Sequence, residues 1–123
     1  MATEKKTAGD LDFVMEQGGT FSRTFTYVDA DSVAVVLTGY TIEMKIREIH
    51  ESSTVLLTAT TGADARFVLS DPTAGEFTLT ISATDTAALT FIQAVYDIKL
   101  TSPTGNVERL LEGSIKLTKQ VTR

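Results

Sequence analysis

Residues 94–119 constrain the fold most, because two long segments of alternating apolar and polar residues flank a tight turn there. Tyr96, Ile98 and Leu100 alternate with polar residues, which is the period of a half-buried strand. The turn at 102–105, Ser-Pro-Thr-Gly, joins a proline that presets φ to a glycine that accepts the left-handed conformation. A hairpin of this length cannot bury its apolar face alone, so the rest of the chain must supply an opposing sheet.

The second strand of this hairpin contains one interruption. Its apolar face is predicted to hold Val107, Arg109, Leu111, Ile115 and Leu117. Leu110 breaks the alternation, and we expect a bulge at Gly113 to absorb the break. On the first strand, we expect Tyr96 to be an aromatic at the edge of the core. The tyrosine corner of immunoglobulin-like domains is the less favoured interpretation, because the inter-sheet cysteines that accompany it in antibody domains are absent.

The composition favours a single β domain. The chain has 123 residues, about one domain, and its hydrophobic content of 42% is enough for a core. It contains 21 threonines, together with many valines, isoleucines and phenylalanines, all of which favour strands. We predict an all-β fold in which residues 11–123 form one antiparallel β-sandwich of about eight strands with one short helical crossover. Residues 1–10 are predicted to be a flexible N-terminal arm.

Two strands are predicted close to the N-terminus. Residues 11–16 alternate apolar and polar side chains, and Gly18 and Gly19 have the chemistry of a two-residue hairpin turn. The second strand, 20–27, places three aromatic side chains on one face. Arg23 lies among them, and we expect its head group to reach past the ring edges, or this face to be only partly covered.

Further strands are predicted at 40–48, 54–60, 66–69 and 76–81. Residues 28–39 are expected to form an edge strand or a loop tucked under the sandwich. The only helical candidate is 82–90, where Thr84 or Asp85 is suited to cap a turn or two. A helix this short would serve as a crossover between the sheets.

The charge and the apolar runs exclude several classes of protein. A formal net charge of −5 and a pI near 4.7 argue against a binder of nucleic acid or anionic membrane. The absence of cysteine excludes disulfides, thiolate metal sites and thiol nucleophiles. The longest apolar run, residues 33–37, is far shorter than the roughly 20 residues of a spanning helix. The first ten residues lack the apolar core of a secretion signal, so we expect a soluble protein made in the cytoplasm.

Candidate catalytic and metal-binding residues are few. His50 is the sole histidine, and a metal or acid–base role would need convergent partners. Asp10 and Asp12, like Asp29 and Asp31, begin a calcium-loop pattern that lacks its later glycine and its final acidic ligand. Phosphate-binding loops and serine nucleophile elbows are absent. We therefore expect no enzymatic activity, no cofactor and no resident metal, although calcium held by loops from distant strands stays an open alternative.

Several short phrases occur along the chain in a definite order. They are LDF at 11–13, QGGTF at 17–21, LTGYT at 37–41, IR at 46–47, SATDTA at 82–87, VYDI at 95–98, RLLEG at 109–113 and VTR at 121–123. In this order they resemble small proteins encoded in the structural gene clusters of tailed bacteriophages. The same pattern is similar to the immunoglobulin-like N-terminal domain of phage baseplate upper proteins, over nearly the whole chain from about Leu11.

This resemblance implies an immunoglobulin-like sandwich that serves as a non-enzymatic virion component, an adaptor or docking domain in the tail, baseplate or neck. Baseplate upper proteins continue into helical and receptor-binder-holding parts, whereas this chain ends at Arg123, so the resemblance implies the docking domain alone. The implied partners are other virion proteins of the tail, baseplate, neck or capsid, and further copies of the chain in a symmetric assembly. Nucleic acid and membrane are not among them. The implied location is the virion, after synthesis in the host cytoplasm.

Assembly of this kind needs a docking surface. Sandwich edge strands have unpaired backbone groups that accept a strand from a neighbour, and the first strand with its arm is a candidate donor. We single out five candidate partner contacts: Leu11, Phe13, Arg23, Tyr40 and Leu110.

Two alternative functions stay open. One is a decoration protein on the capsid surface. The other is a carbohydrate-binding sandwich that contacts the host, for which Tyr27, Tyr40 and Tyr96 are the available tyrosines. The absence of tryptophan counts against this second alternative.

Overall fold

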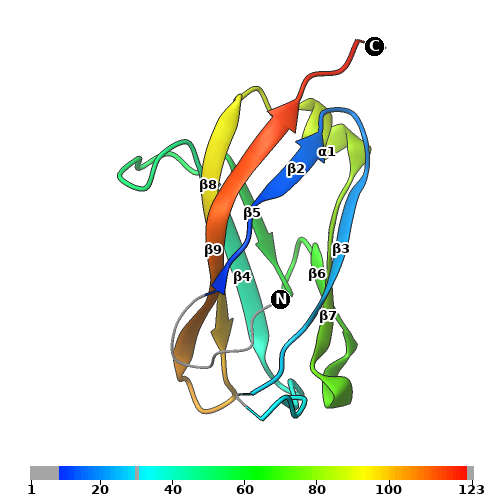
Figure 1. Ribbon diagram of the computed structural model, residues 1–123, viewed down its shortest axis with the longest axis vertical. Coiled ribbons are helices and arrows are strands. Elements are labelled where there is room, and N and C mark those ends of the chain that lie inside the picture. Colours follow the sequence, from blue (N-terminus) through cyan, green and yellow to red (C-terminus); the bar gives the residue numbers. More distant parts are fainter. Residues whose placement is uncertain (1–8, 30, 122–123) are drawn as a thin grey trace.

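The computed structural model describes residues 9–29 and 31–121, which form two β-sheets packed face to face (Figure 1). The large sheet contains β1 (Gly9–Asp10), β2 (Phe13–Glu16), β4 (Thr41–Arg47), β5 (Leu57–Thr60), β8 (Gln93–Thr101) and β9 (Val107–Thr118). The small sheet contains β3 (Phe21–Thr26), β6 (Phe67–Asp71) and β7 (Glu76–Ile81). The predicted all-β sandwich with one short helical crossover is confirmed.

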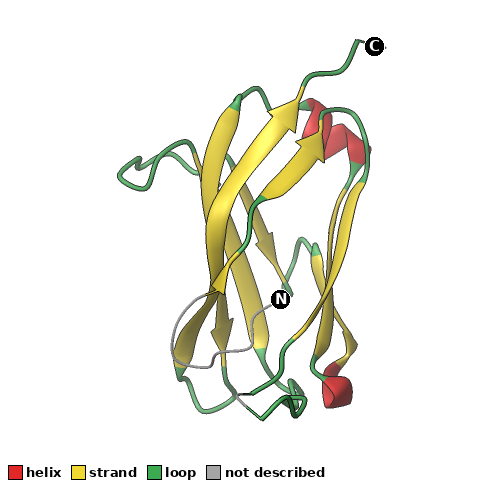
Figure 2. Cartoon of the chain, in the orientation of Figure 1, coloured by secondary structure: helices red, strands yellow, loops and turns green. Residues whose placement is uncertain are grey.

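Two short helical segments lie at opposite ends of the sandwich (Figure 2). The crossover helix α1 (Ala83–Ala87) connects β7 of the small sheet to β8 of the large one, and η1 (Pro72–Ala74) lies between β6 and β7. The cap of α1 is Ser82 rather than the predicted Thr84 or Asp85, because the Ser82 hydroxyl accepts the N–H of Asp85 at 3.2 Å. Within the described part of the chain, no helix has the length and apolar character needed to cross a bilayer.

The N-terminal pairing differs from the prediction. β1 and β2 run parallel to β9 in the large sheet, whereas β3 pairs antiparallel with β7 in the small sheet. Gly18 and Gly19 therefore carry the chain from one sheet to the other and do not form a hairpin. A glycine pair indicates a reversal, but the pairing of β3 is decided by β7, which matches it over all six residues. Of the predicted arm, residues 1–8 lie outside the described residues, and Gly9–Asp10 form β1.

The β8–β9 hairpin is confirmed, but its bulge lies at Leu110 and not at Gly113. Leu110 is the extra residue between the pairs Ile98–Leu111 and Lys99–Arg109. Leu110 and Leu111 are both buried. The inward-facing residues are therefore odd-numbered after the bulge and even-numbered before it. Val107 and Arg109 therefore point to solvent, contrary to the prediction, and Glu108 faces inward.

The core lies between the sheets and follows the predicted alternation on most strands. Rings contact one another across it, from Phe67 through Phe77, Phe25 and Phe13 to Phe21, with centroids 5.1 to 6.0 Å apart. The predicted inward row of β4 is buried, and residues 28–29 and 31–39 lie in the expected loop, tucked in by the fully buried Leu37. Because the core is closed on both faces by these sheets, docking surfaces are to be sought at the two open sides between the sheet edges.

Candidate docking site at the open side of the sandwich

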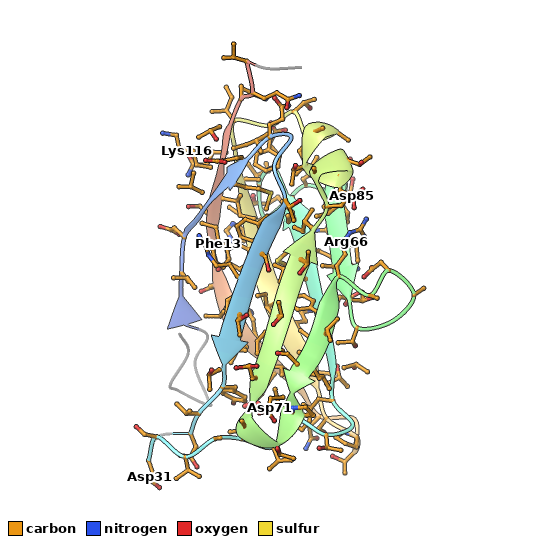
Figure 3. All side chains as sticks on the ribbon, turned by 90° about the vertical axis from the view of Figure 1, so that its right-hand side faces the viewer. Phe13, Asp31, Arg66, Asp71, Asp85 and Lys116 are labelled. Atoms are coloured by element: carbon orange, nitrogen blue, oxygen red, sulfur yellow. The ribbon has the colours of Figure 1, made fainter. Side chains whose placement is uncertain are left out.

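The sandwich has two sides where an edge of the large sheet faces an edge of the small sheet: the β2–β3 side and the β5–β6 side. In Figure 3, where the small sheet faces the viewer, Phe13 lies at the first side, and Arg66 and Asp85 lie at the second. Each side carries one arginine, and the surroundings of the two arginines differ.

The β5–β6 side is tied shut by Arg66. The Nε and Nη2 groups of Arg66 donate to Oδ2 of Asp85 at 3.2 and 2.8 Å, and Nη1 donates to the carbonyl of Thr58 at 2.9 Å. Nη1 also lies 3.7 Å from Oδ2 of Asp64. One guanidinium thus joins β5, the turn after it and α1, and the Arg66 side chain is only 24% exposed.

These contacts alter the titration of both carboxyl groups. The hydrogen bonds from Arg66 lower the pKa of Asp85. Burial raises the pKa of Asp64, but the backbone N–H groups of Arg66 and Thr60 outweigh it, so the pKa of Asp64 also lies below its ordinary value. Both aspartates are ionised at neutral pH, and the lowered pKa values keep them ionised further into acid.

The β2–β3 side carries Arg23, which has no ionic partner among the residues that the structure describes. Arg23 lies on the inward row of β3, and its Cζ is 5.2 Å from the ring centroid of Phe21 and 5.9 Å from that of Phe13. The guanidinium thus lies over these two rings, on the aromatic face where the sequence placed Arg23. It makes no hydrogen bond or ion pair with any described residue. Arg23 is exposed, so its N–H donors face solvent.

A groove of about 320 Å³ runs along this side. It is lined by residues 11–13 of the N-terminal strand, which is residues 9–16 and includes β1 and β2, and by residues 23–26 of β3. Three of the five predicted partner contacts, Leu11, Phe13 and Arg23, line it together. Phe13 is only 5% exposed and belongs mainly to the core, whereas Leu11 is half-buried and Arg23 exposed. The groove therefore offers an apolar floor with one cation at its mouth.

The wall of the groove formed by β3 is an unpaired strand edge. The N–H of Tyr27 donates to the carbonyl of Gly75 at 2.8 Å, so in the antiparallel pattern the odd-numbered residues of β3 bond to β7. Ser22, Thr24 and Thr26 then direct their backbone N–H and C=O groups away from β7. No other described segment pairs with them, because β3 is the last strand of its sheet.

The opposite wall is fixed to β8 and β9 by a clasp that consists of two hydrogen bonds and a close approach of the backbone at Gly113. The hydroxyl of Tyr96 donates to the carbonyl of Leu11, and the N–H of Ser114 donates to Oδ1 of Asp12 at 2.9 Å. A Cβ on Gly113 would collide with the Leu11 carbonyl oxygen, so this position needs glycine. Tyr96 is thus fully within the core and bonds to a backbone carbonyl 85 residues earlier in the chain, unlike a tyrosine corner, which bonds nearby.

Tyr40 and Leu110, the other two predicted contacts, lie away from the groove. Leu110 is 3% exposed, so its side chain stabilises the core and leaves no surface for a partner. Tyr40 is half-buried and lines a separate hollow of about 300 Å³ with Tyr27, Asn106 and Glu108. Burial, and then the adjacent Glu108 carboxylate that accepts the Tyr27 hydroxyl at 3.2 Å, raise the pKa of Tyr27.

Two of the residues considered for metal binding, Asp12 and Asp29, accept backbone N–H groups through their carboxylates. His50 is exposed in a turn, as predicted. Oδ1 of Asp29 accepts the N–H groups of Asp31 and Val33, which makes it a turn residue. Among the residues described, no group of three or more His, Cys, Asp or Glu side chains is arranged to hold a metal ion.

Sequence reasoning missed two features of this region, the free edge of β3 and the closing role of Arg66. Alternating threonines indicated the wet face of a strand, but whether a strand is an edge depends on the topology of the whole sheet. Scans of the sequence against protein-family models and against curated proteins find no match.

Proposed function

We propose that this protein is a non-enzymatic structural component of a tailed-bacteriophage virion, an adaptor or docking domain of the tail, baseplate or neck. It is made in the host cytoplasm, resides in the virion and contacts other virion proteins, with further copies in a symmetric assembly. The immunoglobulin-like kinship implied by the sequence phrases belongs to the same proposal.

The observation that carries the proposal is the open β2–β3 side. A six-residue strand edge that pairs with no described segment borders a groove about 320 Å³ in volume. This volume is at the lower limit for small-molecule pockets, and the site lies open between two strands. Such a shape suits an extended segment of another protein, which is how edge strands commonly bind partners.

The same surface would serve a capsid decoration protein, which differs from an adaptor in copy number and position on the particle. The carbohydrate-binding alternative is supported by the hollow beside Tyr40, where Asn106 and Glu108 supply polar groups. Tyr27 and Tyr96 are 2% and 3% exposed, so Tyr40 is the only one of the three tyrosines with a ring available for stacking. We therefore favour the assembly role.

Antibody labelling of purified particles of the parent phage, viewed by electron microscopy, tests this proposal. Label at the tail tip or neck supports an adaptor, and label over the head supports a decoration protein. If intact particles carry no label and the protein is missing from their denatured digest, the virion role is wrong. A glycan-binding assay with the parent protein and Tyr40→Ala would then test the carbohydrate alternative.

A further inference from the structure

We propose that the free edge of β3 binds an extended, acidic segment of a partner protein, which adds as a strand beside β3 and pairs a carboxylate with Arg23. This inference rests on the proposed docking function and names the chemistry of the partner. It concerns the β2–β3 side alone.

The backbone of β3 provides the first half of the recognition. Ser22, Thr24 and Thr26 present N–H and C=O groups on the side away from β7, along a strand of six residues. An added strand would satisfy these groups and extend the small sheet by one strand. Its alternate side chains would face the groove lined by Leu11 and Phe13.

Arg23 provides the second half, because it makes the edge selective. A charged residue on the inward row of an edge strand discourages indiscriminate pairing, since a covering strand takes the charge out of water. A neutral strand would cover the Arg23 guanidinium and leave its N–H donors without acceptors. A strand with a carboxylate at that level would instead form charge-assisted hydrogen bonds with it. The rings of Phe21 and Phe13 already hold the guanidinium, with their centroids 5.2 and 5.9 Å from its Cζ.

The neighbouring charges fit an acidic occupant better than a second β3 edge. Asp12 is the acidic residue that lines the groove, and its Oδ1 already accepts the N–H of Ser114. It lies beyond ion-pair distance of Arg23, because the pair is not among the salt bridges of the described residues. Two β3 edges paired with each other would bring two Arg23 side chains to one groove, where like charges repel.

The test is selection from a random library of displayed 12-residue peptides on the full-length protein, followed by affinity measurements on the enriched peptides. We expect enriched peptides to carry a carboxylate within an alternating, strand-like sequence. Replacing that carboxylate by its amide should weaken binding about tenfold, the size of a charge-assisted hydrogen bond. Arg23→Gln should weaken binding of the acidic peptide by the same factor, and the two changes together should weaken it no further.

Two further variants separate the backbone from the charge. Thr24→Pro removes an N–H that points away from β7, so the fold tolerates it while strand addition is lost. Lys99→Gln removes an exposed cation on the outer face of the large sheet and should leave binding unchanged. Bound peptide should also slow amide exchange at Ser22, Thr24 and Thr26.

The inference is overturned if no enriched peptide depends on Arg23, or if Thr24→Pro binds as well as the parent protein. It is equally overturned if the carboxylate can be replaced without loss of affinity. Labelling of phage particles is independent of these measurements. A protein that labels the tail but binds no acidic peptide refutes this inference and leaves the docking function standing.

Discussion

The two sides of the sandwich where the sheet edges meet each contain an arginine, and the two arginines have opposite roles. Arg66 bonds to Asp85 and to the Thr58 carbonyl, so it joins β5 to α1 and closes the β5–β6 side. Arg23 rests on two phenylalanine rings without an anionic partner among the described residues. Arg66 therefore stabilises the fold through its bonds, whereas Arg23 leaves its N–H donors available to another molecule at the β2–β3 side.

The two walls of the groove on the β2–β3 side also differ in how they are held. The N-terminal strand is held by the clasp of Tyr96, Asp12 and Gly113, whereas β3 leaves its outer edge unpaired. Contacts with β8 and β9 thus hold the edge of the large sheet in place, whereas the edge strand of the small sheet carries the charge of Arg23. Substitutions on the two sides should separate effects on stability from effects on binding.

The largest expected effect comes from Phe13, which contributes to the core and lies beneath Arg23. Phe13→Ala should lower the free energy of unfolding by about 3–5 kcal/mol, because it leaves a cavity among the contacting rings. Urea denaturation measures this loss. Val14→Ala on the same strand is the matched control, since Val14 is 55% exposed and its truncation should change stability by less than about 0.5 kcal/mol. Equal losses in the two variants would contradict the placement of Phe13.

Opening the closed side should have the next largest effect. Arg66→Gln removes the bonds to Asp85 and weakens the tie to Thr58, so we expect a loss of about 2 kcal/mol, less than for a fully buried ion pair because the side chain is partly exposed. Thermal and urea unfolding measure it, with Lys99→Gln as a control of equal charge change. An unchanged stability would show that the β5–β6 side is closed by other contacts.

The same side should make stability depend on pH in acid. The pKa values of Asp64 and Asp85 are lower in the folded protein than their ordinary 3.8, so their contribution is fully present above pH 3.8 and is lost as the pH falls through the lowered values. Denaturation midpoints measured from neutral pH into this acid range should fall. In Arg66→Gln the fall attributable to these two groups should be smaller. A parallel pH profile in both proteins would show that other carboxylates dominate.

The smallest effect on stability is expected at the open side. Arg23→Gln removes only the contacts with the rings of Phe13 and Phe21, so it should cost less than about 1 kcal/mol. Urea denaturation compares it directly with Arg66→Gln. A loss as large as that of Arg66→Gln would mean that Arg23 holds the fold together, and the contrast between the two sides would disappear.

The fold was largely predictable from residue alternation, and its exceptions have definite causes. Buried rows of β4, β7 and β8 follow from period-two patterns that hold whichever strand lies beside them. The parallel pairing of β2 with β9 was not predictable from local signals, because it depends on a contact between residues about 100 positions apart. The bulge at Leu110 was predicted three residues away, since the sequence shows that the alternation breaks but not which residue leaves the ladder.

The candidate site was also predictable only in part, because residue alternation shows which face of a strand a residue lies on but not which strands lie beside it. Arg23 stood out as a charge on an aromatic face, and Leu11 and Phe13 were placed on the first strand, which was a candidate to pair with a neighbouring subunit. Leu110 is a core residue, because the bulge turns it inward with Leu111. Arg66 is paired because α1, a turn and β5 bring Asp85, Asp64 and the Thr58 carbonyl beside it, whereas no described anionic residue lies beside Arg23. Both surroundings depend on the complete topology, which local patterns do not give.

The parallel pairing of β2 with β9 also sets the order of events during biosynthesis. Phe13 pairs with Ile115, so the N-terminal strand leaves the ribosome 102 residues before the strand on which it rests. At about 5–20 residues per second, that interval is roughly 5–20 s. Throughout it, an apolar segment carrying Phe13 and Met15 has no place in the large sheet, and nascent chains are then open to chaperones and to aggregation. The N-terminal strand can therefore complete its pairing in the large sheet only after β9 has been translated.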